Sequence, residues 1–215
     1  MFLNDNDLVL FQGDSITDSG RPRDGSDWHL GLGYPQLVAA LMGYRHPNLK
    51  LSFLNRGVGG DKVPDLQARW QGDCIELKPD CVSILVGIND ASVAATEHNR
   101  NTAETYEAGY RDILTQLRDK TAARIIILQP FLLQTEHPYS FISPAAAIRR
   151  HLDPIIAAST RLAAEFHALY VPLDNIFRQA SRHVDPTHWA SDAIHPTPAG
   201  HALIAEAWIR AVEER

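Results

Sequence analysis

Cysteine is scarce in this chain, and long apolar stretches are missing from it. Only two cysteines, Cys74 and Cys81, occur among 215 residues. Two cysteines cannot build the disulfide framework of a small secreted domain, and their apolar neighbours predict small core residues rather than a bridge or a metal pair. No stretch approaches the roughly 18 consecutive apolar residues that a membrane-spanning helix needs. The sequence therefore predicts neither a disulfide-stapled protein nor a membrane-spanning one.

Clustered positive charge is missing as well. Lys and Arg number 20 against 26 Asp and Glu, which gives a net charge of −6, and the arginines are dispersed along the chain. A nucleic-acid or anionic-membrane partner requires a basic face, so we expect neither kind of partner. The acidic, polar segment 1–7 has neither the basic start nor the apolar stretch of a signal peptide, which favours a cytoplasmic location.

What is present is the composition of an ordinary globular protein. Hydrophobic residues make up 45% and charged residues 21% of the chain, which excludes extensive disorder. No repeat, linker or change in composition divides the sequence, and its length suits one well-formed core. We therefore expect residues 1–215 to form a single domain.

Short apolar runs alternate with amphipathic segments along the chain. The runs are nearly continuous, as in parallel strands buried on both faces, and comprise Leu8–Gln12, Leu51–Leu54, Cys81–Val86, Arg124–Leu128 and Leu169–Pro172. Helical spacing and start signals predict helices over Tyr34–Met42 and Asp65–Leu77, and further helices beginning at Asn101, at Ser143-Pro144 and at Thr197-Pro198. This alternation predicts an α/β fold, a three-layer α/β/α sandwich whose five-stranded parallel sheet has the flavodoxin-like strand order.

Polar segments, most of them rich in glycine, follow the predicted strands. They are Gly13-Asp14-Ser15-Ile16-Thr17, Gly57-Val58-Gly59-Gly60-Asp61, Gly87-Ile88-Asn89-Asp90 and Asp192-Ala193-Ile194-His195. In parallel sheets, ligands bind beyond the carboxyl ends of the strands. We therefore expect these segments to meet at one edge of the sheet and to form one site.

Ser15 is the candidate nucleophile of this site, because it directly follows the first strand. A serine hydroxyl becomes a good nucleophile only when a base takes its proton. His195 is the candidate base, since Asp192 precedes it by three residues in a loop that leads into a proline-started helix. The Asp192 carboxylate could accept the Nδ1–H bond of the imidazole and leave Nε2 facing the serine.

Three groups are candidates for stabilising a developing oxyanion. They are the backbone N–H of Ser15, the backbone N–H of Gly60 in its glycine-rich turn, and the side-chain amide of Asn89. Asp14 and Asp90 lie beside these residues and are interpreted as braces of the turns. A nucleophile, a base with its carboxylate and several oxyanion donors together predict a serine esterase.

Each segment also has a purely structural interpretation. Ser15 could be a helix cap, the glycines a plain turn, Asn89 an Asx-turn, and Asp192 with His195 a local turn or half of a metal site. No H-E-x-x-H motif, second His/carboxylate cluster or Walker motif is present, so we expect neither a metal nor a cofactor. A non-catalytic flavodoxin-like module that binds a phosphate or nucleotide is the alternative from another class.

Jointly, the segments resemble the SGNH (GDSL-type) hydrolase superfamily over nearly the whole chain and in the family's order. The matching blocks are GDSIT with Ser15, GVGGD with Gly60, GIND with Asn89 and DAIHPTPAGH with His195. The resemblance implies metal-free ester hydrolysis with Ser15 as nucleophile, His195 as base and Asp192 as its orienting acid. It also implies an oxyanion hole made by Ser15, Gly60 and Asn89.

Further segments resemble the bacterial acetylxylan esterases of this superfamily, which remove acetyl groups from sugar hydroxyls and can form oligomers. These segments are GDSITDSGR, Gly33-Tyr34, Asp65–Trp70 and Lys78-Pro79-Asp80. The resemblance implies an oligosaccharide or small-molecule ester as substrate, and a possible homo-oligomer. The chain differs from these enzymes in 132–143 and in 187–190, which we expect to border the substrate. Aromatic side chains that suit sugar rings at the entrance are Trp28, Tyr34, Phe131, Tyr139, Phe141 and Trp189.

Another substrate for the same chemistry stays open. A lysophospholipase, thioesterase or arylesterase would act on other esters, and a long acyl chain would need a deep apolar groove. No extended apolar insertion follows the third or fourth strand, which favours a short acyl group.

Overall fold

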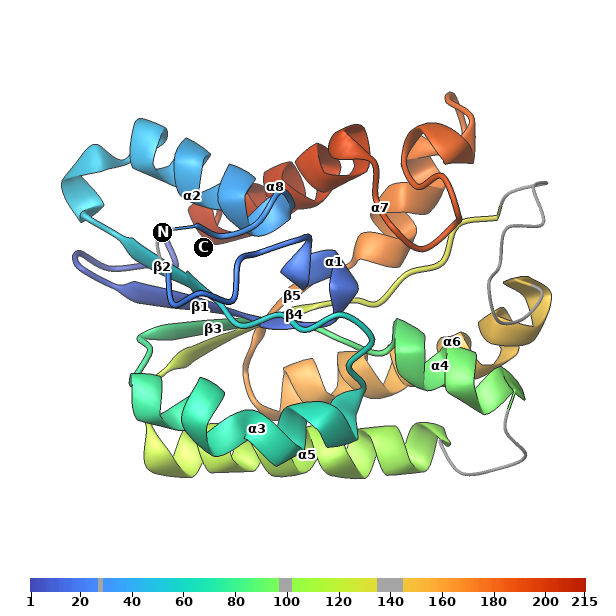
Figure 1. The fold of residues 1–215 in the computed structure, drawn as a ribbon, viewed down its shortest axis with the longest axis horizontal. Coiled ribbons are helices and arrows are strands. Elements are labelled where there is room, and N and C mark those ends of the chain that lie inside the picture. The colour runs from blue at the N-terminus through green and yellow to red at the C-terminus, as the bar shows by residue number, and fades with distance from the viewer. Residues whose placement is uncertain (27–28, 97–101, 135–144) are drawn as a thin grey trace.

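A twisted parallel sheet forms the middle layer of the protein (Figure 1). The computed structural model describes residues 1–26, 29–96, 102–134 and 145–215. Its five strands lie in the order β2-β1-β3-β4-β5. They are β1 (Leu8–Gly13), β2 (Ser52–Asn55), β3 (Cys81–Leu85), β4 (Arg124–Leu128) and β5 (Leu169–Val171). All neighbouring pairs are parallel, so the predicted α/β class and flavodoxin-like order are confirmed.

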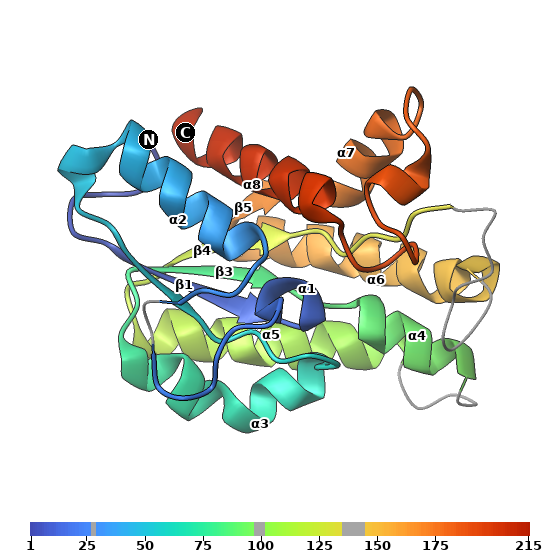
Figure 2. The ribbon, with the colours of Figure 1, turned by 45° about the horizontal axis from the view of Figure 1, so that its top comes forward.

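Helices cover both faces of the sheet. Figures 1 and 2 show α2 (Tyr34–Arg45), α7 (Leu173–Ala180) and α8 (Pro198–Glu213) on one face. The other face carries α3 (Val63–Asp73), α4 (Ile88–Thr96), α5 (Ala103–Lys120) and α6 (Ala145–Glu165). The short α1 (Ser15–Asp18) follows β1, and three single-turn 3₁₀ helices cover Pro47–Leu49, Ile75–Leu77 and Pro186–His188. None of the helices in these ranges combines the length and the apolar character needed to cross a bilayer.

Burial of both sheet faces explains the nearly continuous apolar strands. Every residue of β3 is buried, and the central residues of β4 are fully inaccessible. On α8 the buried stripe includes Ile204, Trp208 and Val212, and the Trp208 indole N–H donates to Ser83 Oγ at 3.0 Å. The one polar atom of this large side chain is thus satisfied inside the core. Cys74 and Cys81 are free and buried, as predicted.

The structure corrects several helix boundaries. α5 is capped by Thr102 rather than opened by Asn101 and Glu104, because Thr102 and Thr105 exchange backbone-to-hydroxyl bonds in a capping box. α3 begins at Val63 and stops at Asp73, before a separate 3₁₀ turn. The predicted start at Ser143-Pro144 lies outside the described residues, whereas the start of α8 after the Thr197 cap is confirmed.

Candidate active site

A tight turn at the end of β1 presents Ser15. Gly13 has a φ of +153°, and a Cβ built there would lie 2.3 Å from the carbonyl oxygen of Leu85 on the neighbouring strand. Only glycine fits this position. The Asp14 side chain then caps α1, accepting the Ile16 N–H at 3.0 Å. Ser15 is consequently the first residue of α1 at the carboxyl end of β1, and Figure 1 shows α1 and α4 at this same edge of the sheet.

A continuous hydrogen-bonded relay joins Ser15 to His195 and Asp192. Ser15 Oγ lies 2.9 Å from His195 Nε2, although the two residues are 180 positions apart. On the other side of the ring, Nδ1 lies 2.6 Å from Asp192 Oδ2. The predicted convergence of these three side chains is therefore present in the fold.

The loop that carries His195 is held by its own backbone contacts. Asp192 Oδ1 accepts the N–H groups of Ile194 and His195, at 3.0 and 2.7 Å. Ala193 adopts a left-handed φ of 73°, and its carbonyl accepts the Leu133 N–H. Asp192 thus supports the turn with one carboxylate oxygen and the imidazole with the other. This division of labour fixes the orientation of the ring.

The electrostatics of the pair follow from these bonds. Partial burial by itself would raise the pKa of Asp192, but the hydrogen bonds from the His195 side chain and backbone outweigh it and lower the pKa to about 2. The side-chain bond to Asp192 raises the pKa of His195 above its ordinary 6.5. The carboxylate is therefore ionised at neutral pH and favours the imidazolium form of the ring.

Asp14 and Asp90 are buried beneath the site, where the sequence predicted turn braces. Each accepts a backbone N–H: Asp14 from Ile16, and Asp90 from Val63 at 3.2 Å. Burial raises the pKa of both carboxyls to about 7. The bracing interpretation is confirmed by these contacts, which tie the ends of two strands to the following loops.

The loop after β2 leaves Gly60 with a free amide. Gly60 has a φ of +86°, and no atom lies within 4 Å of a Cβ built on it, so its Cα borders open space. Asp18 accepts the N–H of Gly59, and Asn55 accepts that of Gly57. In the part of the chain that the structure describes, the amides of Ser15 and Gly60 donate to no protein group. Both are available to an incoming oxyanion.

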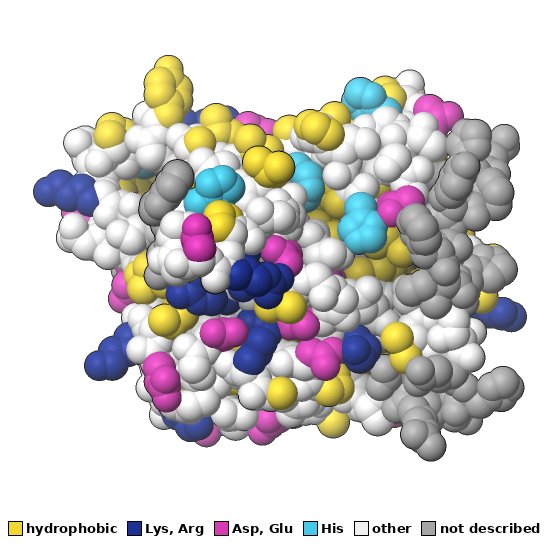
Figure 3. Space-filling view, viewed as in Figure 1, with side chains coloured by type: hydrophobic (Ala, Val, Ile, Leu, Met, Phe, Trp, Pro, Cys, Tyr) yellow, Lys and Arg dark blue, Asp and Glu magenta, His cyan; other side chains and the backbone are white. Residues whose placement is uncertain are grey.

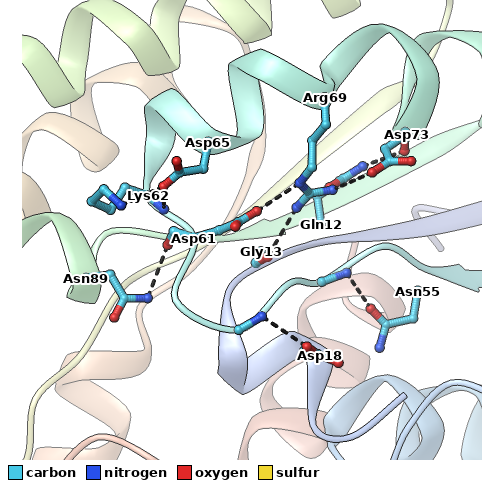
Figure 4. A network of polar contacts seen from close by, with 12 residues as sticks. Gln12, Gly13, Asp18, Asn55, Asp61, Lys62, Asp65, Arg69, Asp73 and Asn89 are labelled. Carbon is cyan, nitrogen blue, oxygen red and sulfur yellow. Dashed lines mark hydrogen bonds and ion pairs between the residues drawn. The ribbon is translucent and has the colours of Figure 1, made fainter. Parts of the chain in front are cut away.

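Asn89, the third predicted donor, is oriented by the same loop. Its Nδ2 donates to the Asp61 carbonyl at 3.1 Å, which uses one of the two amide hydrogens (Figure 4). Asp61 is held in turn by Arg69, whose Nε donates to its carboxylate at 2.8 Å. The Arg69 guanidinium also reaches Gln12, Asp73 and the Gly13 carbonyl. One arginine therefore ties β1, α3 and the loop next to Gly60 together.

Sequence reasoning did not find this supporting layer. Asp18, Asn55 and Arg69 each make a contact with a residue 38 to 57 positions away, and no local pattern in the sequence reveals such contacts. His201 was also missed. It is buried in α8, and burial lowers its pKa to about 4, so the neutral ring accepts the Tyr34 N–H.

The aromatic residues expected at the entrance have mixed outcomes. Tyr34 and Phe131 are fully buried, so the prediction that they line the entrance is wrong. Tyr34 packs edge-on against Phe11 with its hydroxyl on Thr17, while Phe131 stacks on Phe177. Trp189 is half-buried and packs against His188. The other candidates, Trp28, Tyr139 and Phe141, lie outside the described residues.

No group of three or more His, Cys, Asp or Glu side chains that could hold a metal occurs within the described ranges. The arrangement brings together the groups that acyl transfer through a serine requires. These groups are a serine hydroxyl, an imidazole beside it that can accept a proton, an ionised carboxylate on the other side of the ring, and backbone amides of Ser15 and Gly60 that donate to no described protein group.

Comparisons with known proteins match the chain over nearly its full length. Residues 11–203 match the family model described as the GDSL-like Lipase/Acylhydrolase family. An acetylxylan esterase of Geobacillus stearothermophilus is 32% identical over 219 aligned residues, covering 99% of this chain and 96% of that protein. The crystal structure of the acetylxylan esterase Axe2 from the same organism superposes with a TM-score of 0.86 at 32% identity, covering 99% and 96% of the two chains. The crystal structure of a candidate GDSL-like lipase from Parabacteroides merdae superposes with a TM-score of 0.91 at 31% identity, covering 99% of this chain and 98% of that chain.

Proposed function

We propose that this chain, which belongs to the GDSL-like lipase/acylhydrolase family, removes acetyl groups from the hydroxyls of xylo-oligosaccharides. Family membership and the full-length similarity to an acetylxylan esterase make it a serine ester hydrolase. The observation that carries the assignment of residues is the relay of 2.9 and 2.6 Å from Ser15 through His195 to Asp192.

The proposed reaction begins with attack of Ser15 Oγ on the acetyl carbonyl carbon. His195 Nε2 takes the hydroxyl proton as the oxygen–carbon bond forms, and the ionised Asp192 stabilises the resulting imidazolium. The imidazolium then gives its proton to the sugar oxygen as that oxygen leaves. A water molecule attacks the acetyl-enzyme with His195 again as base, which releases acetate and restores the serine.

The negative charge of each tetrahedral intermediate falls on the former carbonyl oxygen. The N–H groups of Ser15 and Gly60 and the second hydrogen of Asn89 Nδ2 are the proposed donors to this oxygen. Their positions are set in advance by the Gly13 turn, by Asp18 and by the Asp61–Arg69 pair. Donors that are already oriented need no reorganisation when the charge appears.

Activity on different acyl groups tests this function. Purified enzyme is expected to release acetate from acetylated xylo-oligosaccharides and to cleave 4-nitrophenyl acetate faster than the butyrate and octanoate esters. The similar protein from Geobacillus stearothermophilus is an acetylxylan esterase. In addition, the sequence after β3 lacks an apolar insertion that would hold a long acyl chain. A preference for octanoate, or for lysophospholipids and thioesters, would replace the deacetylase assignment by the alternative within the same family.

Replacing Asn89 by alanine is expected to lower kcat by about 10²–10³ with little change in KM, because the lost hydrogen bond forms mainly in the transition state. The comparison is steady-state kinetics on 4-nitrophenyl acetate. Asn48→Ala is a matched control, since Asn48 is exposed in the 3₁₀ turn 47–49 and precedes β2 at the opposite end of the strand. An Asn89→Ala enzyme with the wild-type kcat would remove Asn89 from the oxyanion hole.

Location and assembly belong to the proposal as well. A cytoplasmic location agrees with two buried cysteines that remain unpaired, as is usual in a reducing compartment. A homo-oligomer is proposed on the resemblance to the acetylxylan esterases alone, and light scattering of the purified chain tests it.

A further inference from the structure

Arginines that are dispersed in the sequence come together in one pocket. Arg21, Arg23 and Arg56 line a cavity of about 230 Å³, with Ser26, His29 and Asn55 among the other lining residues. We call this cavity the arginine pocket. Figure 3 shows Lys and Arg side chains gathered near the middle of the face that also displays several histidines. Asp and Glu side chains lie among them in the same view, so the charge of the pocket depends on which arginines are paired.

We propose that the arginine pocket binds the carboxylate of a uronic acid carried by the same oligosaccharide whose acetyl group is presented to Ser15. The inference rests on the proposed function, because it assigns an acidic substituent to that substrate. It predicts that the enzyme prefers acetylated oligosaccharides with a uronate branch over neutral ones.

The charge balance of the pocket supports an anionic ligand. Arg21 is half-buried and uses its Nε to donate to the Gly57 carbonyl at 2.8 Å. Among the described residues no carboxylate is paired with Arg21, which leaves its terminal nitrogens for a ligand. Burial lowers the pKa of Arg21, and so does the positive charge of Arg23 and Arg56. Asp73 also lines the pocket but accepts a bond from Arg69, and Asp18 pairs with Arg23. Arginine stays protonated, so the charge of Arg21 favours an anion.

The donor geometry suits a carboxylate. A guanidinium presents parallel N–H groups that bind both oxygens of a carboxylate or phosphate, and these charge-assisted bonds are stronger than neutral ones. The Ser26 hydroxyl in the lining can contact the sugar that carries the acid. Because uronic acids are the anionic substituents that acetylated plant oligosaccharides carry, we commit to a carboxylate.

The arginine pocket lies next to the nucleophile. Arg23 Nη2 is 2.6 Å from Asp18 Oδ2, and the same oxygen accepts the Gly59 N–H at 2.9 Å. A Cβ built on Gly59 would lie 3.7 Å from Asp18 Oδ2 and 3.9 Å from Ser15 Cβ. Gly59 therefore separates the Arg23–Asp18 pair from Ser15. Arg23, in the lining of the pocket, is thus linked to Ser15 through Asp18 and Gly59, and we infer that one oligosaccharide spans both.

The test compares two substrates that differ only in charge. Kinetics are measured on acetylated xylo-oligosaccharides with and without one glucuronate branch, for the wild type, Arg21→Gln and Arg23→Gln. The wild type is expected to show a kcat/KM ratio, acidic over neutral, of about ten, which corresponds to one charge-assisted hydrogen-bonded contact. Each variant should bring this ratio close to one, and added salt should lower it in the wild type. Arg23→Gln keeps the bond from Arg21 to the Gly57 carbonyl. A loss of preference in this variant therefore cannot be explained by a disturbed loop around Gly57.

Arg118→Gln is the matched control, because the Arg118 side chain is 60% exposed near the end of α5, where it pairs with Asp119 and lies over the Phe166 ring. It should keep the wild-type ratio. A wild-type ratio near one, or an unchanged ratio in both pocket variants, would overturn the assignment of the arginine pocket. Acetate release from the neutral substrate in the same assay would still support the deacetylase function.

Binding separates the two proposals if neither substrate is turned over. Calorimetry with the deacetylated oligosaccharides should show tighter binding of the glucuronate-bearing one to the wild type and loss of that difference in Arg21→Gln. Equal binding of both sugars would overturn the pocket assignment. Inorganic phosphate and sulfate are titrated in the same way, and their binding to the wild type without binding of the uronate would overturn the carboxylate assignment in favour of a phosphate-type ligand.

Discussion

An alanine at position 15 is expected to lower kcat on 4-nitrophenyl acetate by about 10⁵–10⁶, because removal of the nucleophile abolishes the covalent route. Ser15 Oγ is the atom that faces His195 Nε2 at 2.9 Å, and within the described ranges no other hydroxyl contacts this nitrogen. Residual turnover of about 10³–10⁴ over the uncatalysed reaction would come from the remaining oxyanion donors and from binding. The KM is expected to change little, since the lost oxygen is small.

The fold should tolerate this substitution, so the loss can be assigned to chemistry. Ser15 is only half-buried, and α1 is capped by Asp14 rather than by Ser15. Ser191→Ala is a matched control on the same rim, because Ser191 is exposed and directly precedes Asp192 in the loop. Wild type and Ser191→Ala should react with one equivalent of an organophosphonate, and Ser15→Ala with none. Labelling of Ser15→Ala at the wild-type rate would mean that another residue is the nucleophile. It would also reopen the choice of a non-catalytic binding module.

The sheet could be predicted from sequence because its strands are buried on both faces. β3 and β4 are nearly continuous apolar runs in the sequence, and their boundaries were predicted to within one residue. Helices with a clear apolar stripe, such as α8, were found for the same reason. α4 and α7 were missed, since each is short and α4 begins inside a segment that was interpreted as a polar loop.

The reacting side chains were predictable and their support was not. Ser15 and the Asp192–His195 pair sit in segments with a local signature, next to a strand end or a helix start. The contacts of Arg69 depend on three segments that meet only in the folded chain (Figure 4). For Tyr34 the local sequence was misleading, and the prediction that it lines the entrance was wrong. It stands beside a glycine at a helix start, which suggests an exposed position, yet its ring fills the core against Phe11.

The positions of the arginines along the sequence also did not predict where their charges lie in the folded protein. Arg21 and Arg23 belong to the segment after α1, and Arg56 follows β2, so no basic cluster is visible in the sequence. Because β1 and β2 are neighbours in the sheet, the loops at their carboxyl ends lie together. The same topology that assembles the candidate active site therefore assembles the arginine pocket beside it.

Substituting asparagine for Asp192 is expected to lower kcat by about 10⁴, because the imidazole would lose its fixed tautomer and the charge that stabilises the imidazolium. Asparagine keeps one oxygen, which can still accept the N–H groups of Ile194 and His195, so the loop should hold its shape. The change therefore removes charge more than structure.

The pH profile distinguishes this role from a structural one. His195 acts only when neutral, so kcat/KM of the wild type should rise with pH through a pKa above 6.5, since Asp192 raises the pKa of the ring. In Asp192→Asn that contribution is gone, and the rise of the residual activity should move to lower pH. Asp119→Asn, at an exposed position that pairs with Arg118, should leave the profile where it is. If the loss in Asp192→Asn came without any movement of the acid limb, Asp192 would be acting through the loop and not through the charge on His195.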